Sequence, residues 1–133
     1  KSSFSSSWNS SVQTRKQRKF RAKAPLHLKH RFLSANLSKE LRKKHGKRSL
    51  PLRKGDEVLV MRGSFAKKQA KVASVNLKKG LVTLEGIQRS KREGSKVAVP
   101  FNPRALQIKI LSLDDKHRLD IFKRKTGVKN ASN

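Results

Sequence analysis

The chain has 133 residues, with 35 Lys or Arg, 8 Asp or Glu and no Cys, which gives a formal net charge of +27. No window approaches the ~20 apolar residues of a membrane span, and without Cys there is no disulfide framework. A chain this basic repels itself unless a polyanion neutralises it, so we expect nucleic acid as its partner. Anionic membrane and acidic protein are the lesser options.

The charge divides the chain into three parts. Residues 1–52 hold 15 basic and one acidic side chain (net +14), residues 53–110 hold 14 and 4 (+10), and residues 111–133 hold 6 and 3 (+3). Only the middle part has a regular apolar pattern. We therefore predict a basic arm over residues 1–50, a small barrel over residues 51–111 and a helical tail over residues 112–133.

The arm starts with a Ser-rich segment, since seven of the first 11 residues are Ser. With only Phe4 and Trp8 to bury, we expect this segment to be disordered. Its composition also fits a transit peptide, although no amphipathic period supports that alternative. The basic run Arg15–Arg21 is expected to stay extended. It reads either as a solvated tail or nuclear-import patch, or as an arm that becomes ordered on phosphates.

A short helix is predicted from Ser38 to Gly46. Ser38 is a suitable N-cap, Glu40 suits the positive end of the helix dipole, and Gly46 can adopt the left-handed conformation that ends a helix. The Ala24-Pro25 pair favours an extended Ala24.

Five short strands are predicted in the centre: Val58–Met61, Val72–Val75, Leu81–Leu84, Lys96–Val99 and Leu106–Ile110. Turn signals at Gly63, Gly80 and Gly94 separate them. In the last strand, Leu106, Ile108 and Ile110 are expected on one face. Five short strands favour a barrel, because closure removes exposed edges. A helix capped by Ser112 or Asp114 is predicted after them.

The sequence contains no residue pattern typical of an active site. His27 and His30 are three residues apart, but no Cys or nearby carboxylate completes a metal-ligand set. Asp114 and Asp115 are adjacent, and adjacent helical residues do not face each other. The Gly63–Lys68 loop lacks the spacing of a phosphate-binding loop. We expect no enzyme activity, no metal and no cofactor.

A nucleic-acid-binding role must depend on phosphate charge and shape, because the chain has six Phe, one Trp and no Tyr to stack on bases. Phe65, in the loop between two predicted strands, is a candidate contact. The alternative is that it folds back onto the barrel.

One resemblance adds to this interpretation. The segment Arg53–Gly63 resembles the start of a KOW motif, and Lys71–Val75 resembles its end. Ahead of them, Ala24–His27 and Leu37–Pro51 resemble the universal ribosomal protein twenty-four family of the large subunit, in its archaeal and eukaryotic branch. The resemblance runs from about Thr14 to about Arg124. It departs from the family at the KOW loop, where the family usually has Gly at the position of Lys67.

The resemblance implies a mainly β fold, with an SH3-like barrel that binds large-subunit rRNA near its 5′ region. It also implies an early role in assembly, neighbouring large-subunit proteins, and a place beside the peptide exit tunnel, where nascent-chain factors are a further partner to test. In the family a hairpin loop, matched here by Gln88–Lys96, approaches that exit. The location would be the cytoplasmic ribosome, with nucleolar transit in a eukaryote.

The residues expected to contact RNA are basic, with one aromatic exception: Arg15, Lys16, Arg18, Lys19, Arg21, Arg42, Lys43, Arg48, Arg53, Lys54, Arg62, Phe65, Lys67, Lys68, Lys71, Arg89, Lys91 and Arg92.

Two alternatives remain open. The first is a KOW module of a transcription or chromatin factor, since such factors also carry the motif. The second is a cationic membrane-active protein, which would need a basic helix with a wide apolar face that the sequence does not show.

Overall fold

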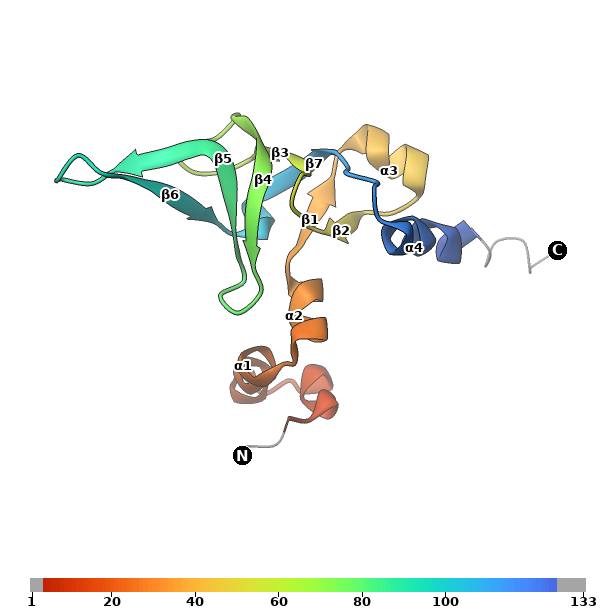
Figure 1. Cartoon of the computed structure of the whole chain (residues 1–133). Coiled ribbons are helices and arrows are strands. Elements are labelled where there is room, and N and C mark those ends of the chain that lie inside the picture. The colour runs from red at the N-terminus through yellow and green to blue at the C-terminus, as the bar shows by residue number, and fades with distance from the viewer. Residues whose placement is uncertain (1–3, 127–133) are drawn as a thin grey trace.

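The computed structural model describes residues 4–126, with side chains through residue 122, and contains one seven-stranded mixed sheet (Figure 1). The sheet order is β2-β1-β7-β3-β4-β5-β6. A mainly β, barrel-like fold is thereby confirmed. The five predicted central strands are present, β4 to β6 being longer than predicted: β3 Glu57–Val60, β4 Gln69–Asn76, β5 Leu81–Ser90, β6 Lys96–Phe101 and β7 Leu106–Ile110.

Two further strands come from the segment that we assigned to the arm. β1 (Ser34–Leu37) runs parallel to β7 and antiparallel to β2 (Ser49–Pro51). These strands have four and three residues and little β-branched content, so no period identifies them. Leu33, Ala35, Leu37 and Leu50 are nevertheless buried in the core. Core residues thus lie on both sides of residue 50, and the division into arm, barrel and tail stays a prediction.

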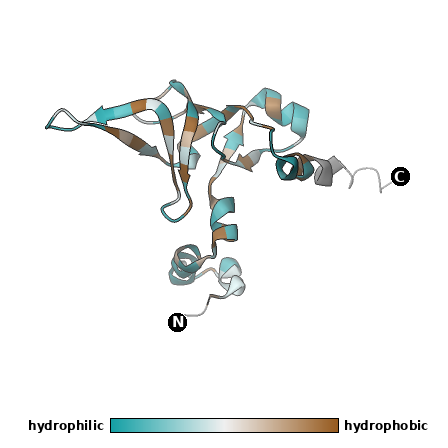
Figure 2. Cartoon of the chain, in the orientation of Figure 1, coloured by the Kyte–Doolittle hydropathy of each residue, from teal (hydrophilic) through white to brown (hydrophobic). Residues whose placement is uncertain are grey.

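The core of the barrel is aliphatic and well excluded from water. Val58, Val60, Val72, Val82 and Ile108 have no exposed surface. Figure 2 shows hydrophobic residues concentrated on the barrel strands, whereas α1 is largely hydrophilic. Half-buried and fully buried residues alternate along β3, as expected for a strand with one face toward the core.

The predicted shared face of β7 is wrong at one position. Leu106 and Ile108 are buried, but Ile110 is 57% exposed. The register explains the difference, because Val58 pairs with Ile108 while the preceding Glu57 pairs with Ile110. Lys109 is therefore an extra residue, and such a β-bulge turns the residue after it off the core face.

β5 bends sharply and carries a hairpin out of the barrel. The β5–β6 pairing shifts between Thr83 and Gln88, and Gly86 at the bend has a φ of 71°, a conformation that favours glycine. Beyond the bend, Gln88–Ser90 pairs with Lys96–Ala98. The result is a two-stranded hairpin that projects to the left in Figure 1.

The predicted short helix is confirmed as α3 (Lys39–His45). The Ser38 side chain accepts a hydrogen bond from the Leu41 amide at 3.4 Å. Gly46 has a φ of 61°, and its amide donates to the Arg42 carbonyl at 2.8 Å. Both ends of the helix are thus capped as the sequence predicted.

Residues 4–32 are folded, and over this range the expectation of a disordered and extended arm is wrong. A 3₁₀ helix η1 (Ser6–Ser10) precedes α1 (Thr14–Lys23) and α2 (Leu26–Phe32), with an extended Ala24 between the two α-helices. We call residues 4–32 the N-terminal lobe. It lies below the barrel in Figure 1.

An aromatic cluster holds this lobe together. The Phe20 ring is 5.5 Å from Phe4 and 5.8 Å from Phe32, and Phe4 is 6.1 Å from Trp8. The Gln17 amide donates to the carbonyls of Asn9 and Ser11 at 2.8 Å. The prediction failed because we judged Phe4 and Trp8 without Phe20 and Phe32, which are distant in sequence. Phe20 is the only buried residue of α1, so this helix lacks a wide apolar face.

α4 (Lys116–Thr126) is the predicted C-terminal helix, but neither predicted residue caps it. Asp115 accepts from the His117 amide at 2.8 Å, whereas Ser112 donates to the Asp114 carboxylate. Residues 127–133 of the predicted tail lie outside the described part.

A buried ion pair fixes α4 to the barrel, and no pattern in the sequence predicted it. Arg118 is 2% exposed and Asp56 is fully buried. Arg118 Nη1 and Nη2 donate to Asp56 Oδ1 and Oδ2 at 2.6 and 2.7 Å. Asp56 also accepts from the backbone amides of Arg53 (2.9 Å) and Ser112 (3.0 Å). Every lone-pair direction of this carboxylate is used, as burial of a charge requires.

We expect Arg118→Met to lower the free energy of unfolding by about 3–5 kcal/mol, because it leaves the Asp56 carboxylate buried and uncompensated. Thermal and urea denaturation measure this. Lys116→Met, on an exposed position of the same helix, is the matched control and should cost less than about 0.5 kcal/mol. Equal effects of the two substitutions would contradict a stabilising role for the pair.

Phe20→Ala should unfold the N-terminal lobe while the barrel remains folded, because Phe20 joins the aromatic cluster and not the barrel core. Trp8 is the only Trp of the chain, so its fluorescence reports on the lobe alone. We expect a red-shifted Trp8 emission with the main melting transition retained. Val12→Ala, at a residue 98% exposed in the same lobe, should leave the emission unchanged.

Candidate nucleic-acid interface

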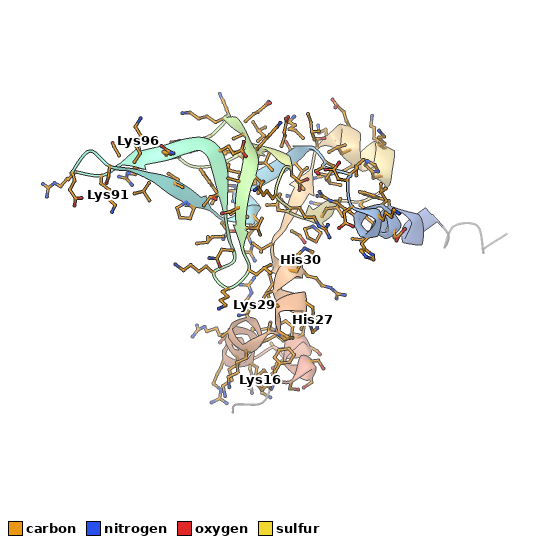
Figure 3. All side chains as sticks on the ribbon, viewed as in Figure 1. Lys16, His27, Lys29, His30, Lys91 and Lys96 are labelled. Atoms are coloured by element: carbon orange, nitrogen blue, oxygen red, sulfur yellow. The ribbon has the colours of Figure 1, made fainter. Side chains whose placement is uncertain are left out.

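The structure exposes most of the predicted contact residues. Of the 18, Lys16, Arg42, Arg53 and Phe65 are half-buried, and the other 14 have exposed side chains. They fall into four regions: α1 of the lobe, the segment from α3 to the start of β3, the β3–β4 loop with the start of β4, and the β5–β6 hairpin. Figure 3 shows the basic side chains pointing outward from the lobe and the hairpin.

One groove brings three predicted residues together from separate elements. Arg62 and Phe65 of the β3–β4 loop face Arg89 of β5 across a cavity of about 540 Å³. Gly63 and Ser64 of the loop, Val99 to Phe101 of β6 and the following Asn102 complete its lining. Two guanidinium groups beside an aromatic ring are the combination that binds a phosphate and stacks on the adjoining base or sugar.

Phe65 packs partly on the barrel and is half-buried. Its ring lies edge-on to the buried Phe101, with 6.0 Å between centroids, so part of it packs on the barrel. The remainder is accessible, and Lys68 Nζ lies 5.4 Å from the ring centroid. Contact with Phe101 holds the ring in one orientation, which suits a stacking platform.

The loop that carries Phe65 contains a strained residue. Lys67 has a φ of 69° and is the only non-glycine residue with positive φ in the described part of the chain. Its amide donates to the Val60 carbonyl at 2.8 Å, which fixes this conformation. The resemblance places glycine at this position, and the left-handed backbone is the physical reason for that preference.

Some predicted residues are paired with acidic groups or partly buried. Arg53 pairs with the Asp115 carboxylate, and Lys71 Nζ lies 3.7 Å from Glu57 Oε1. The Arg42 Nε atom is buried and has no hydrogen-bond partner. These three side chains are less available to phosphate than Lys43, Arg48 and Lys54, which are exposed.

The hairpin presents a basic tip. Arg89, Lys91 and Arg92 are all exposed, and the turn is closed by hydrogen bonds from the Lys91 amide to the Ser95 carbonyl and from the Gly94 amide to the Lys91 carbonyl. In Figure 3 the labelled Lys91 and Lys96 lie near the far end of the molecule. The hairpin and the lobe are therefore separate contact surfaces.

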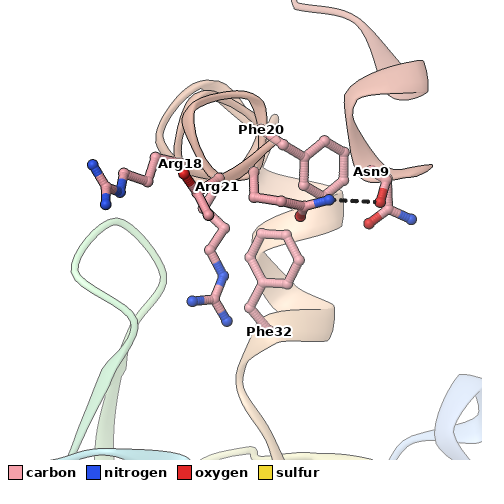
Figure 4. A pocket seen from close by; sticks show the side chains of 7 residues that line it. Asn9, Arg18, Phe20, Arg21 and Phe32 are labelled. Carbon is pink, nitrogen blue, oxygen red and sulfur yellow. Dashed lines mark hydrogen bonds between the residues drawn. The ribbon is translucent and has the colours of Figure 1, made fainter. Parts of the chain in front are cut away.

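Sequence reasoning missed four cations that line a second cavity, of about 260 Å³, together with Arg21. These are Lys29, Lys78, Lys79 and Arg104. From the sequence, the Lys78-Lys79-Gly80 segment predicted only a turn. The cavity appears because the fold brings this turn opposite α1 and α2. A third cavity, of about 490 Å³, lies inside the lobe and is lined by residues that include Asn9, Arg18 and Phe20 (Figure 4).

Residues 4–126 hold no group of three His, Cys, Asp or Glu placed to bind a metal ion. Over the same range, no helix is both long enough and apolar enough to cross a membrane.

Comparison with known proteins agrees with the resemblance noted in the sequence. A family model that describes eukaryotic ribosomal protein L26 and its archaeal counterpart matches residues 11–125. A protein of Methanothrix thermoacetophila named large ribosomal subunit protein uL24 is 46% identical to the chain over 114 residues. The match covers 86% of this chain and 98% of that protein. The family model spans α1, the barrel and most of α4.

We expect Lys67→Gly to raise the free energy of unfolding by about 0.5–1 kcal/mol, because relief of the left-handed strain exceeds the added entropy of the unfolded chain. Chemical denaturation measures the change. The adjacent Lys68→Gly removes the same charge at a residue without positive φ, and it should be neutral or destabilising. A stabilising Lys68→Gly would assign the gain to charge removal instead.

Stability should fall as the pH is lowered from about 7 to about 5. Burial, followed by Arg53 and Arg118, lowers the pKa of His30 from its ordinary 6.5, and burial followed by Lys44 lowers that of His45. The unfolded chain then binds more protons below pH 6.5, which favours unfolding. Denaturation across this range should show the slope in the wild type and a weaker slope in the His30→Gln/His45→Gln variant. An unchanged slope would exclude these two residues as its source.

Proposed function

The chain belongs to the family formed by eukaryotic ribosomal protein L26 and its archaeal counterpart, and from this premise we propose that it binds large-subunit rRNA as a structural component of the ribosome. The observation that carries the proposal is the groove in which Arg62, Phe65 and Arg89 meet. Its guanidinium groups contact phosphates, and its aromatic ring packs on an adjoining sugar or base. This role requires no catalytic group.

The rest of the basic surface supplies affinity rather than sequence recognition. Neutralisation of phosphates by Lys and Arg releases counterions from RNA, which makes binding strong and dependent on salt. α1 contributes Arg15, Lys16, Arg18 and Lys19 on a folded helix instead of an extended arm. The lobe therefore presents these charges with less ordering cost than a disordered arm.

Three finer proposals rest on the resemblance. We propose that the rRNA contact lies near the 5′ region, that binding occurs early in assembly, and that the projecting hairpin reaches toward the peptide exit tunnel. The length of the hairpin beyond the bend in β5 supports the last of these, since its basic tip stands well away from the barrel (Figure 1). We place the protein on the cytoplasmic ribosome, with nucleolar transit in a eukaryotic source.

The test is equilibrium binding to a transcript of the large-subunit rRNA of Methanothrix thermoacetophila, the source of the 46% identical relative. We expect Arg62→Gln/Arg89→Gln to weaken binding and to reduce the slope of log K against log[salt] by about 2, one for each lost phosphate contact. The control Lys39→Gln/Lys44→Gln removes two charges from exposed positions of α3. Equal effects of both variants would exclude the groove as a specific contact.

Co-sedimentation from a cell lysate separates this function from the remaining alternative. Retention with the large subunit through moderately high salt is the expected result. Migration with RNA polymerase or chromatin would instead favour a KOW module of a transcription or chromatin factor.

A further inference from the structure

The second cavity lies between two parts of the molecule that are distant in sequence. Arg21 and Lys29 reach it from α1 and α2 of the lobe, and Lys78 and Lys79 reach it from the turn between β4 and β5. Arg104 of the 3₁₀ helix η2 (Pro103–Ala105) completes the basic lining. Figure 4 shows Arg21 between the Phe32 ring and the neighbouring turn. We call this the lobe–barrel cavity.

Its charge is one-sided and uncompensated. The lining contains five cations and no acidic residue. Within the described part of the chain, none of the five forms an ion pair, since the carboxylates of Asp56, Glu57 and Asp115 pair with Arg118, Lys71 and Arg53 instead. Five like charges around about 260 Å³ repel one another, and an anion inside the cavity would remove that repulsion.

Local hydrogen bonds hold the backbone on the barrel side of the cavity. The Asn76 side chain accepts from the Lys79 amide at 3.0 Å, and the Asn76 carbonyl accepts from the Gly80 amide at 2.8 Å. Across the cavity, the Asn102 side chain accepts from the Arg104 amide at 3.1 Å. The Arg21 guanidinium lies 6.0 Å from the centroid of the Phe32 ring, a cation–π contact that limits its freedom.

We propose that the lobe–barrel cavity binds consecutive backbone phosphates of an RNA strand, and that this strand holds the N-terminal lobe against the barrel. The proposal rests on the rRNA-binding function proposed above and assigns a site to it. RNA is favoured over an acidic polypeptide because Phe32, 40% exposed beside Arg21, offers a stacking face next to the cations. The polar contacts are to the backbone rather than to base edges, because Asn102, the only amide side chain in the lining, has its oxygen bonded to the Arg104 amide.

The first experiment is lysine acetylation footprinting of the full chain, read by mass spectrometry, with and without the large-subunit rRNA transcript. We expect Lys29, Lys78 and Lys79 to be protected together on RNA binding, and more strongly than Lys39, Lys44 and Lys109, which are exposed on α3 and β7. Equal protection of the two sets of lysines, in a complex that does form, would overturn the proposal and leave the rRNA-binding function intact. Absence of any complex would instead refute that function.

The second experiment compares matched charge variants. Lys78→Gln/Lys79→Gln/Arg104→Gln should weaken rRNA binding about tenfold or more at moderate salt and lower the salt slope by about 2–3, since each lost phosphate contact changes the slope by about 1. Lys39→Gln/Lys44→Gln/Lys109→Gln has the same net charge and should change both quantities much less. Circular dichroism and Trp8 fluorescence confirm that both variants are folded. Equal losses would show that only overall charge matters.

Polyglutamate is the competing probe for the same cavity. At the same salt it should protect Lys29, Lys78 and Lys79 less than rRNA does, because it has no group to stack on Phe32. Protection by polyglutamate but not by rRNA would overturn the proposal in favour of an acidic protein partner.

Discussion

A single buried carboxylate organises the connection between the barrel and the C-terminal part of the chain. Asp56 receives hydrogen bonds from Arg53, Ser112 and both terminal nitrogens of Arg118, so three chain segments meet at one side chain. Burial of a charge is unfavourable unless it is fully paired, and this condition allows only one placement of α4. The geometry of the Asp56 site thus defines how the last helix lies against the start of β3. His45, stacked on Phe122 at 4.2 Å, and Lys47, which donates to the Ile121 carbonyl, extend the contact to the other side of α4.

The same charge balance explains the division between structural and binding cations. With 8 acidic residues against 35 basic ones, few cations can be paired internally. Three of the acidic groups, beside β3 and α4, stabilise the fold through ion pairs with Arg118, Arg53 and Lys71. The cations of the lobe, the β4–β5 turn and the hairpin have no such partners among the described ion pairs. Their charge is left for an external polyanion, which is the physical basis of the RNA-binding interpretation.

Sequence patterns correctly predicted the features that depend on residues close together in the sequence. The ends of α3 followed from Ser38 and Gly46, and the central strands followed from their apolar alternation and from the glycines between them. The features that sequence reasoning missed depend on long-range contacts. β1 is a strand because β7 lies beside it, and β2 is a strand because it pairs with β1. The lobe is ordered because Phe20 and Phe32 complete a cluster with Phe4, and Asp56 is buried because Arg118 returns to it. For the candidate interface, charge identified the groove residues Arg62 and Arg89, but Lys78, Lys79 and Arg104 became visible only when the fold placed them opposite the lobe.

The position of β7 has a consequence for the order in which the chain folds. β7 lies between β1 and β3 in the sheet, although β1 comes some 70 residues earlier in the sequence, as the pairing of Asn36 with Gln107 shows. During synthesis, β1 of the β1–β2 pair and β3 of the β3–β6 strands each have an unpaired edge. These edges stay unpaired until β7 emerges and joins them. Non-local pairings of this kind slow folding and leave edges open for longer. The N-terminal lobe depends on contacts between residues within about 30 positions of one another, so it can form before β7 completes the barrel.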